Sequence, residues 1–132
     1  MPIDEAFFAE EAGKILVVDD DAKTYKLITS AFDQYKFASA ANGFEAGLQL
    51  ASFQPDLLVL NLDTPGIDAL EMCQSVKASP KAKRAKILVL AKSAQEKAVA
   101  EALACGADGY LVKPLQAEEL RPKVQSLMGR GR

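Results

Sequence analysis

The hydrophobic positions of the chain follow two alternating patterns. Five short runs rich in valine, isoleucine, leucine or aromatic residues predict strands, at residues 15–18, 37–40, 57–60, 87–90 and 110–112. Between these runs, hydrophobic residues recur three and four positions apart, which predicts helices with one buried stripe. Strands and helices that alternate in this way form a parallel sheet with crossover helices. The pattern therefore predicts an α/β fold, a right-handed doubly wound (βα)5 domain.

Polar residues with the spacing of a helix-capping box mark three expected helix starts. The pairs are Asn42 with Glu45, Asp68 with Glu71, and Ser93 with Glu96. We therefore expect helices to begin just after Asn42, at about Ala69 and at about Ala94. The closing helix is expected at residues 117–128, and Pro122 should kink it because proline removes one backbone donor.

Composition narrows the chemistry that the domain can perform. The 132 residues are 49% hydrophobic and 26% charged, which is typical of one compact soluble domain. The absence of histidine excludes a histidine-based triad, an imidazole general base and most catalytic zinc sites. Carboxylates and lysines must therefore carry any chemistry.

Charge gives no reason to expect a direct nucleic-acid partner. The net charge is −2, so the domain as a whole does not attract phosphates. One local run of basic residues is interpreted as a solvated loop between a helix and a strand. It comprises Lys77, Lys81, Lys83, Arg84 and Lys86.

Neither a membrane nor an oxidising compartment is indicated. No apolar run reaches the roughly 20 residues that cross a bilayer, and the N-terminus lacks the basic and apolar regions of a secretory signal. We therefore expect a cytoplasmic protein without a membrane partner. Cys73 and Cys105 lack the spacing of a metal site or a redox pair, so both are expected to be reduced packing residues.

Polar and charged residues follow several of the predicted strands. Asp19 and Asp20 follow the first strand, Asn61 follows the third, Ala91 follows the fourth and Lys113 follows the fifth. In doubly wound sheets, ligands and chemistry collect at the carboxyl ends of the strands. Residues that are far apart in the sequence are therefore expected to form one cluster.

Three motifs in register give the chain a family resemblance. The segments are "ILVVDDD", "PDLLVLNLDTPGIDAL" and "GADGYLVKPL". Together they make residues 14–128 similar to the receiver domain of response regulators. The resemblance implies a flavodoxin-like sandwich with the strand order 2-1-3-4-5. It leaves residues 1–13 as an N-terminal extension or linker and residues 129–132 as a C-terminal tail.

The resemblance also implies roles for individual residues. In receivers, an aspartate at the position of Asn61 accepts a phosphoryl group, an acidic pair holds a divalent metal, and a lysine binds the phosphoryl oxygens. The residues of this chain that correspond to the other family positions are Asp19 and Asp20 for the acidic pair and Lys113 for the lysine. Tyr110 corresponds to the aromatic switch residue, and Ala91 stands where a threonine or serine is usual.

Two of these positions depart from the family pattern. Covalent phosphoryl transfer needs an anionic oxygen, and the neutral amide of Asn61 offers neither the charge nor a stable acyl phosphate. Ala91 has no hydroxyl with which to bind a phosphoryl group. The sequence therefore predicts a degenerate receiver that is not phosphorylated and has no catalytic residue.

A weak metal site is the most that the remaining residues imply. Mg²⁺ prefers several hard, anionic oxygens. Here it would meet Asp20, the backbone carbonyl of Asp63 and the amide oxygen of Asn61, with Asp19 acting indirectly. We expect Mg²⁺ binding to be weak and no cofactor to be required. We further hypothesise that the Asn61 amide donates a hydrogen bond to one of the paired aspartates.

Function is then expected to rest on a surface. The resemblance implies a partner face made of the fourth helix, the fifth strand and the fifth helix. Its candidate residues are Lys97, Glu101, Tyr110, Glu118, Glu119 and Arg121. The expected partner is a protein, such as a histidine kinase, an effector or another signalling protein, and the same face is a candidate homodimer interface.

Other interpretations remain open at this stage. The chain could be a phosphorylatable regulator that uses a non-standard residue such as Asp63, or a regulatory domain cut from a larger DNA-binding regulator. A haloacid dehalogenase-like phosphatase would need an aspartate at Asn61. A nucleotide-binding flavodoxin-like protein would need a glycine-rich loop where Asp19, Asp20 and Asp21 stand.

Overall fold

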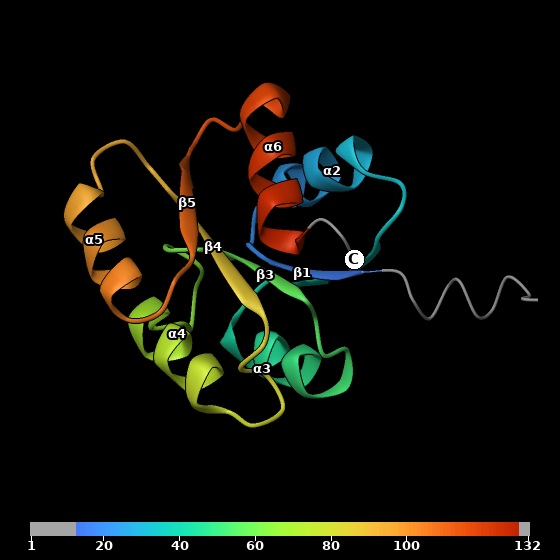
Figure 1. Cartoon of the computed structure of the whole chain (residues 1–132). Helices are drawn as coiled ribbons and strands as arrows, with labels where there is room; N and C mark the ends of the chain where they lie inside the picture. Colours follow the sequence, from blue (N-terminus) through green and yellow to red (C-terminus); the bar gives the residue numbers. More distant parts are fainter. Residues whose placement is uncertain (1–12, 130–132) are drawn as a thin grey trace, which may run out of the picture.

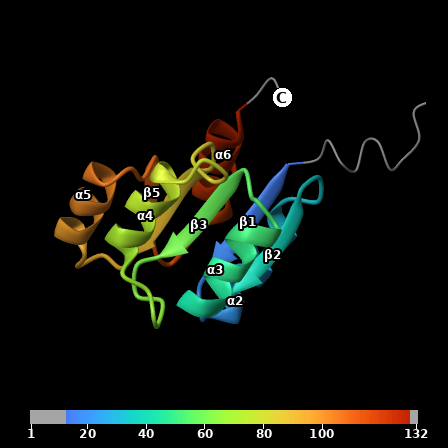
Figure 2. The ribbon, with the colours of Figure 1, turned by 90° about the horizontal axis from the view of Figure 1, so that it is seen from below.

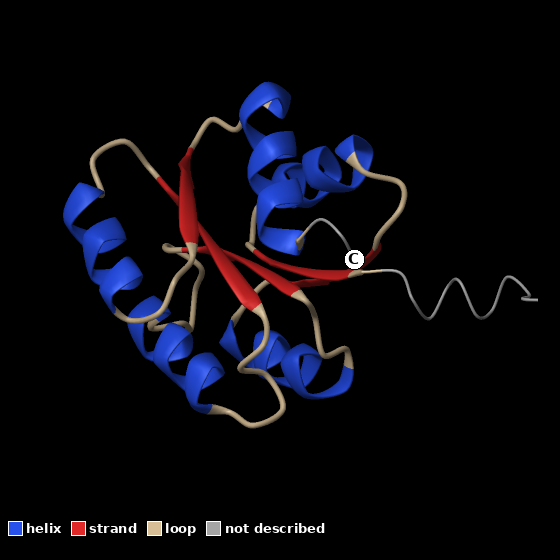
Figure 3. Cartoon of the chain, viewed as in Figure 1, coloured by secondary structure: helices blue, strands red, loops and turns tan. Residues whose placement is uncertain are grey.

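The computed structural model describes residues 13–129 as one sheet between two layers of helices (Figures 1 and 3). The five parallel strands have the order β2-β1-β3-β4-β5, which confirms the predicted architecture. The strands are β1 (Lys14–Val18), β2 (Lys36–Ala40), β3 (Leu57–Asn61), β4 (Lys86–Ala91) and β5 (Gly109–Val112). The helices are α2 (Ala22–Ala31), α3 (Gly43–Ser52), α4 (Ala69–Ala78), α5 (Glu96–Ala104) and α6 (Ala117–Met128).

The central strands are buried on both faces, because α2 and α6 cover one face and α3, α4 and α5 cover the other (Figure 1). In β1, Ile15 and Val17 belong to the core beneath α2 and α6, whereas Leu16 and Val18 belong to the core on the opposite face. Successive strand residues point to opposite faces of a sheet. A strand covered on both sides must therefore be apolar along its buried length, as residues 15–18 of β1 and 57–60 of β3 are.

Two of the three predicted capping pairs start helices. The Asn42 Oδ1 atom accepts a hydrogen bond from the Glu45 backbone N at 3.0 Å, and α3 begins at the next residue, Gly43. Asp68 Oδ1 accepts from the backbone N atoms of Leu70 and Glu71, both at 3.1 Å, and α4 begins at Ala69. A side-chain acceptor at this position satisfies donors that have no partner within the helix.

The third predicted capping pair, Ser93 with Glu96, was wrong. Helix α5 begins at Glu96, not at Ala94, and the position before it is Gln95, which makes no side-chain cap. Ser93 is exposed in the turn that precedes the helix. The Gln95 side chain closes this turn instead, because its Oε1 atom accepts from the Lys92 backbone N at 2.7 Å.

The last helix runs from Ala117 to Met128 without interruption at Pro122. Within residues 13–129, no helix is long and apolar enough to cross a bilayer. Apart from Gly13 and Gly129, the proposed N-terminal extension (1–13) and C-terminal tail (129–132) lie outside the described residues.

The interpretation of the basic run as a solvated loop needs correction at Lys77 and at Lys86, which opens β4. Arg84 lies in the loop with its side chain 79% exposed, as expected. Lys77 lies within α4, and its Nζ atom is 2.9 Å from Asp108 Oδ2 and donates to the carbonyl of Ala85. Arg84 pairs with Asp56 at 3.1 Å. Both pairs join segments about 30 residues apart, so the local sequence gives no sign of them.

Candidate functional site

The register of the sheet brings the predicted cluster to one edge. Val18 pairs with Leu60, so Asp19 and Asn61 follow neighbouring strand positions. Ala91 pairs with Val112, so Lys113 follows directly beyond the same edge. Figure 2 shows the arrowheads of β1 and β3 pointing the same way. The tertiary structure thus assembles the residues that the sequence separates.

Asp19 and Lys113 form the central contact of this edge. Lys113 Nζ lies 2.8 Å from Asp19 Oδ2, and the Asp19 side chain is 1% exposed while that of Lys113 is 23% exposed. The other oxygen, Oδ1, accepts from the Asp21 backbone N at 3.0 Å. Both oxygens of the buried carboxylate are therefore occupied, as the burial of a charge requires.

The hypothesised hydrogen bond of Asn61 is not present. Asn61 is 7% exposed, and within the described chain its side chain donates neither to Asp19 nor to Asp20. Each oxygen of the Asp19 carboxylate accepts instead from another group, Oδ1 from the Asp21 backbone N and Oδ2 from Lys113 Nζ. Because no buried side-chain N or O atom among residues 13–129 lacks a partner, the Asn61 amide keeps access to solvent.

Thr64 is a site residue that the sequence analysis missed. It is 3% exposed, and its hydroxyl lies 2.8 Å from the Asn61 carbonyl oxygen and 3.3 Å from that of Val18. It therefore joins the ends of β3 and β1. Its position three residues after Asn61 is a turn signal, but a threonine in a turn is normally exposed.

Asp63 connects the two loops beside Asn61 and Ala91. Its Oδ1 atom accepts from Gln95 Nε2 at 2.8 Å, and its Oδ2 atom lies 3.4 Å from Lys92 Nζ. We call these three side chains, Asp63, Lys92 and Gln95, the loop bridge. Lys92 and Gln95 were not predicted, because Gln95 lies 32 residues from Asp63 in the sequence.

The residues at this edge fit Mg²⁺ poorly. Asp20 is exposed and is the one acidic side chain of the predicted ligand set that forms no hydrogen bond or ion pair among residues 13–129. The described part of the chain contains no group of three or more His, Cys, Asp or Glu side chains that could hold a metal ion. A strong site needs more anionic oxygens than this edge provides.

Ala91 and Tyr110 occupy contrasting environments. Ala91 is fully buried, and its methyl group offers no hydrogen bond, whereas Tyr110 is 44% exposed. Tyr110 lines a groove of about 440 Å³ between α5 and β5, together with Val99, Leu103 and Val112. The residues predicted for the partner face, Lys97, Glu101, Tyr110, Glu118, Glu119 and Arg121, are all exposed.

The two cysteines are free thiols, as expected. Cys73 is fully buried in α4, and burial, with a smaller contribution from the neighbouring Cys105, raises the pKa of its thiol from 9.0 to about 11. Cys105 lies just beyond α5. A buried thiol with a raised pKa is a packing residue, not a nucleophile.

Comparison with known proteins agrees with the fold. The family described as response regulator receiver domain matches residues 15–125. The chain is 31% identical over 121 residues to the phosphate regulon transcriptional regulatory protein PhoB of Rhizobium meliloti, covering 90% of this chain and 53% of that protein. It is 36% identical over 119 residues to the transcriptional regulatory protein AfsQ1 of Streptomyces coelicolor, covering 89% and 51%. The chain thus spans about half the length of these relatives.

Two solved structures agree with this chain over nearly their whole length. A signal receiver domain from Bermanella marisrubri superposes with a TM-score of 0.78 at 34% identity, over 89% of this chain and 99% of that one. The chemotaxis response regulator CheY4 of Vibrio cholerae gives a TM-score of 0.79 at 26% identity, over 88% and 98%. The chain with Asp19, Asn61 and Lys113 at one edge of its sheet therefore belongs to the response regulator receiver domain family.

Proposed function

We propose that this receiver is a signalling module that is not phosphorylated and that acts by binding other proteins, without catalysis of its own. The observation that carries the proposal is the position of Asn61, next to Asp19 in the register of β1 and β3. An amide at this position cannot form a stable acyl phosphate.

The environment of Ala91 supports the same conclusion. Ala91 is fully buried at the end of β4, and its methyl side chain provides no hydroxyl at the edge of the sheet. A phosphoryl group would find one fewer donor here than in a receiver with threonine or serine. Both the acceptor and one binding group are therefore missing.

The loop bridge supplies a second argument. Asp63, Lys92 and Gln95 hold the loop after β3 against the loop after β4 through contacts of 2.8 and 3.4 Å. These contacts need no phosphoryl group. We infer that the arrangement of the two loops, and with it the surface of the neighbouring α5, does not depend on phosphorylation.

The proposed partner is a protein that binds the face of α5, β5 and α6. The groove beside Tyr110 has apolar walls, and Lys92 and Glu96 flank it with opposite charges. An apolar centre with a charged rim is typical of protein interfaces. A histidine kinase, an effector or another signalling protein of the cytoplasm is the class of partner that we propose. Mg²⁺ binding, if measured, should be weak because Asp20 is the one carboxylate available.

A second candidate function follows from the lengths of the relatives. PhoB and AfsQ1 are transcriptional regulatory proteins, and this chain corresponds to about half of each. The alternative is therefore the regulatory domain of a longer transcriptional regulator. In that case any contact with DNA would belong to another part of the protein, because this domain has a net charge of −2.

Intact mass measurement tests the proposal. The chain is incubated with Mg²⁺ and acetyl phosphate, and we expect its mass to stay unchanged. The matched control is Asn61→Asp, which restores a carboxylate at the same position and should gain a phosphoryl adduct. An adduct on the parent chain would overturn the proposal. Loss of that adduct in Asp63→Asn would then identify Asp63 as the acceptor.

A further inference from the structure

Helix α3 contains a glycine that the fold does not require. A Cβ atom on Gly47 would meet nothing within 4 Å, so no neighbour excludes a side chain there. Glycine inside a helix is less favourable than alanine because it loses more backbone entropy. Gly43 differs, because a Cβ atom there would clash with the carbonyl oxygen of Gly66. The open space beside Gly47 therefore calls for another explanation.

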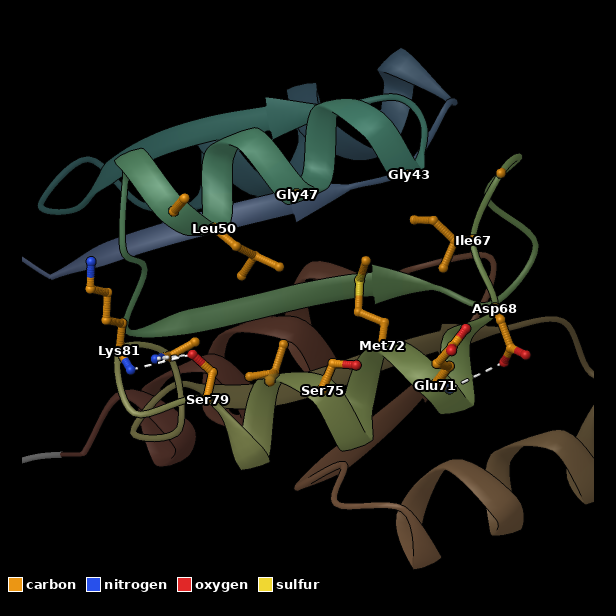
Figure 4. Close-up of a pocket in the computed structure, with 14 residues that line it drawn as sticks. Gly43, Gly47, Leu50, Ile67, Asp68, Glu71, Met72, Ser75, Ser79 and Lys81 are labelled. Carbon is orange, nitrogen blue, oxygen red and sulfur yellow. Dashed lines mark hydrogen bonds between the residues drawn. The ribbon is translucent and has the colours of Figure 1, made fainter.

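Gly47 leaves one wall of a groove open. The groove lies between α3 and α4 and has a volume of about 440 Å³ (Figure 4). Three apolar side chains point into it: Leu50 from α3, Ile67 from the loop before α4, and Met72 from α4. These side chains make the floor apolar, and a groove of this size accommodates one or two side chains from another molecule.

Two exposed apolar side chains stand beside the same groove. Phe44 is 77% exposed and Leu48 is 57% exposed. With about 3.6 residues per turn, both lie next to the groove residue Ala51 and opposite the buried Ala46. Apolar side chains this exposed and one helical turn apart are typical of an interaction surface.

The two ends of the groove have opposite charges. Glu71 and Asp68 lie at one end and Lys81 at the other (Figure 4). Within residues 13–129, neither Glu71 nor Lys81 forms an ion pair. Both charges are therefore available to a binding partner.

We propose that the chain forms a two-fold homodimer in which the α3–α4 grooves of two copies face each other in antiparallel orientation. In a two-fold dimer the same surface of both copies forms the interface, so that surface must carry both the protruding side chains and the groove that receives them. Phe44 and Leu48 protrude, and the space at Gly47 receives them. Antiparallel orientation brings Lys81 of one copy to Glu71 of the other. This interface leaves the face of α5, β5 and α6 free, and it does not depend on whether the chain is phosphorylated.

Sedimentation equilibrium of the full 132-residue chain tests the interface. Protein concentrations from about 10 μM to about 1 mM cover the range in which weak dimers dissociate. We expect the parent to dimerise in this range. Leu48→Glu, which puts a charge on the apolar surface, and Gly47→Met, which fills the groove, should each weaken dimerisation about tenfold or more. The matched control is Leu103→Glu on α5, a residue that is 40% exposed and should leave the dimer unchanged.

The charges provide an independent test. Lys81→Glu should weaken the dimer, and adding Glu71→Lys to it should restore association, because the pair is then reversed across the interface. Circular dichroism confirms that each variant is folded. A parent that stays monomeric up to about 1 mM would overturn the proposal. So would a dimer that Leu103→Glu disrupts while Leu48→Glu and Gly47→Met leave it intact.

Discussion

Lys113 Nζ lies 2.8 Å from Asp19 Oδ2, although the two residues are 94 positions apart in the sequence. The contact joins the end of β5 to the end of β1 across β3 and β4. Because the Asp19 carboxylate is almost fully buried, its charge depends on this lysine and on the Asp21 backbone N. The pair therefore stabilises the edge at which Asn61 lies.

Removing the lysine should destabilise the domain. We expect Lys113→Met to lower the free energy of unfolding by about 2 kcal/mol, because it leaves a buried carboxylate without its cation. Urea unfolding measures the change. The control is Arg84→Met, which removes the ion pair with Asp56. The Arg84 side chain is 79% exposed, so this loss should cost about 0.5 kcal/mol or less. Equal losses in the two variants would contradict the importance of the Asp19 pair.

The loop bridge predicts a local effect. Asp63→Ala removes the acceptor of Gln95 and the partner of Lys92, so the turn at residues 92–95 should open more often. We expect amide hydrogen exchange in this turn to become about fivefold faster, which corresponds to about 1 kcal/mol. Lys97→Ala, at an exposed position of α5, serves as the control. Unchanged exchange in Asp63→Ala would show that the bridge does not hold the loops.

The helix starts predict different costs for two cap substitutions. Asp68→Ala removes the acceptor for two backbone donors of α4 and should cost about 1 kcal/mol. Ser93→Ala should change stability by about 0.5 kcal/mol or less, because Ser93 does not cap α5. Chemical denaturation of both variants checks this. A loss at Ser93 as large as that at Asp68 would restore the capping role that the sequence indicated.

The raised pKa of Cys73 predicts slow reaction with thiol reagents. Only the thiolate reacts, and with a pKa of about 11 the Cys73 thiol stays protonated at pH 8. Single-cysteine variants, Cys105→Ser and Cys73→Ser, separate the two reactions, and the chain that retains only Cys73 should react more slowly. Fast labelling of Cys73 at pH 8 would contradict its burial.

The same shift predicts how stability depends on alkaline pH. The folded pKa lies above the ordinary value of 9.0, so the contribution of Cys73 is fully present below about pH 9 and is lost as pH rises through about 11. Cys73→Ala should therefore show a smaller loss of stability than the parent between these pH values. Thermal melts across this range measure the difference. Identical pH dependence in both proteins would contradict the assignment.

The sequence by itself determined the order of the elements and most of their bounds. Strands covered on both faces must be apolar throughout, so residues 57–60 could be recognised from their side chains alone. Asn42 and Asp68 start helices through bonds to residues two or three positions away, and local spacing reveals such bonds. The chemical character of Asn61 also follows from the sequence alone, because its side-chain amide carries no negative charge.

Only the tertiary structure decided which side chains meet at the edge of the sheet. Ser93 has the spacing of a cap, yet Gln95 closes the turn and binds Asp63, 32 residues away. The Asn61 amide was expected to bind a carboxylate, but the donors that reach Asp19 are Lys113 Nζ and the Asp21 backbone N. The physical reason is that a hydrogen-bond acceptor is satisfied by the donor that the folded chain brings within about 3 Å, and that donor is often distant in sequence.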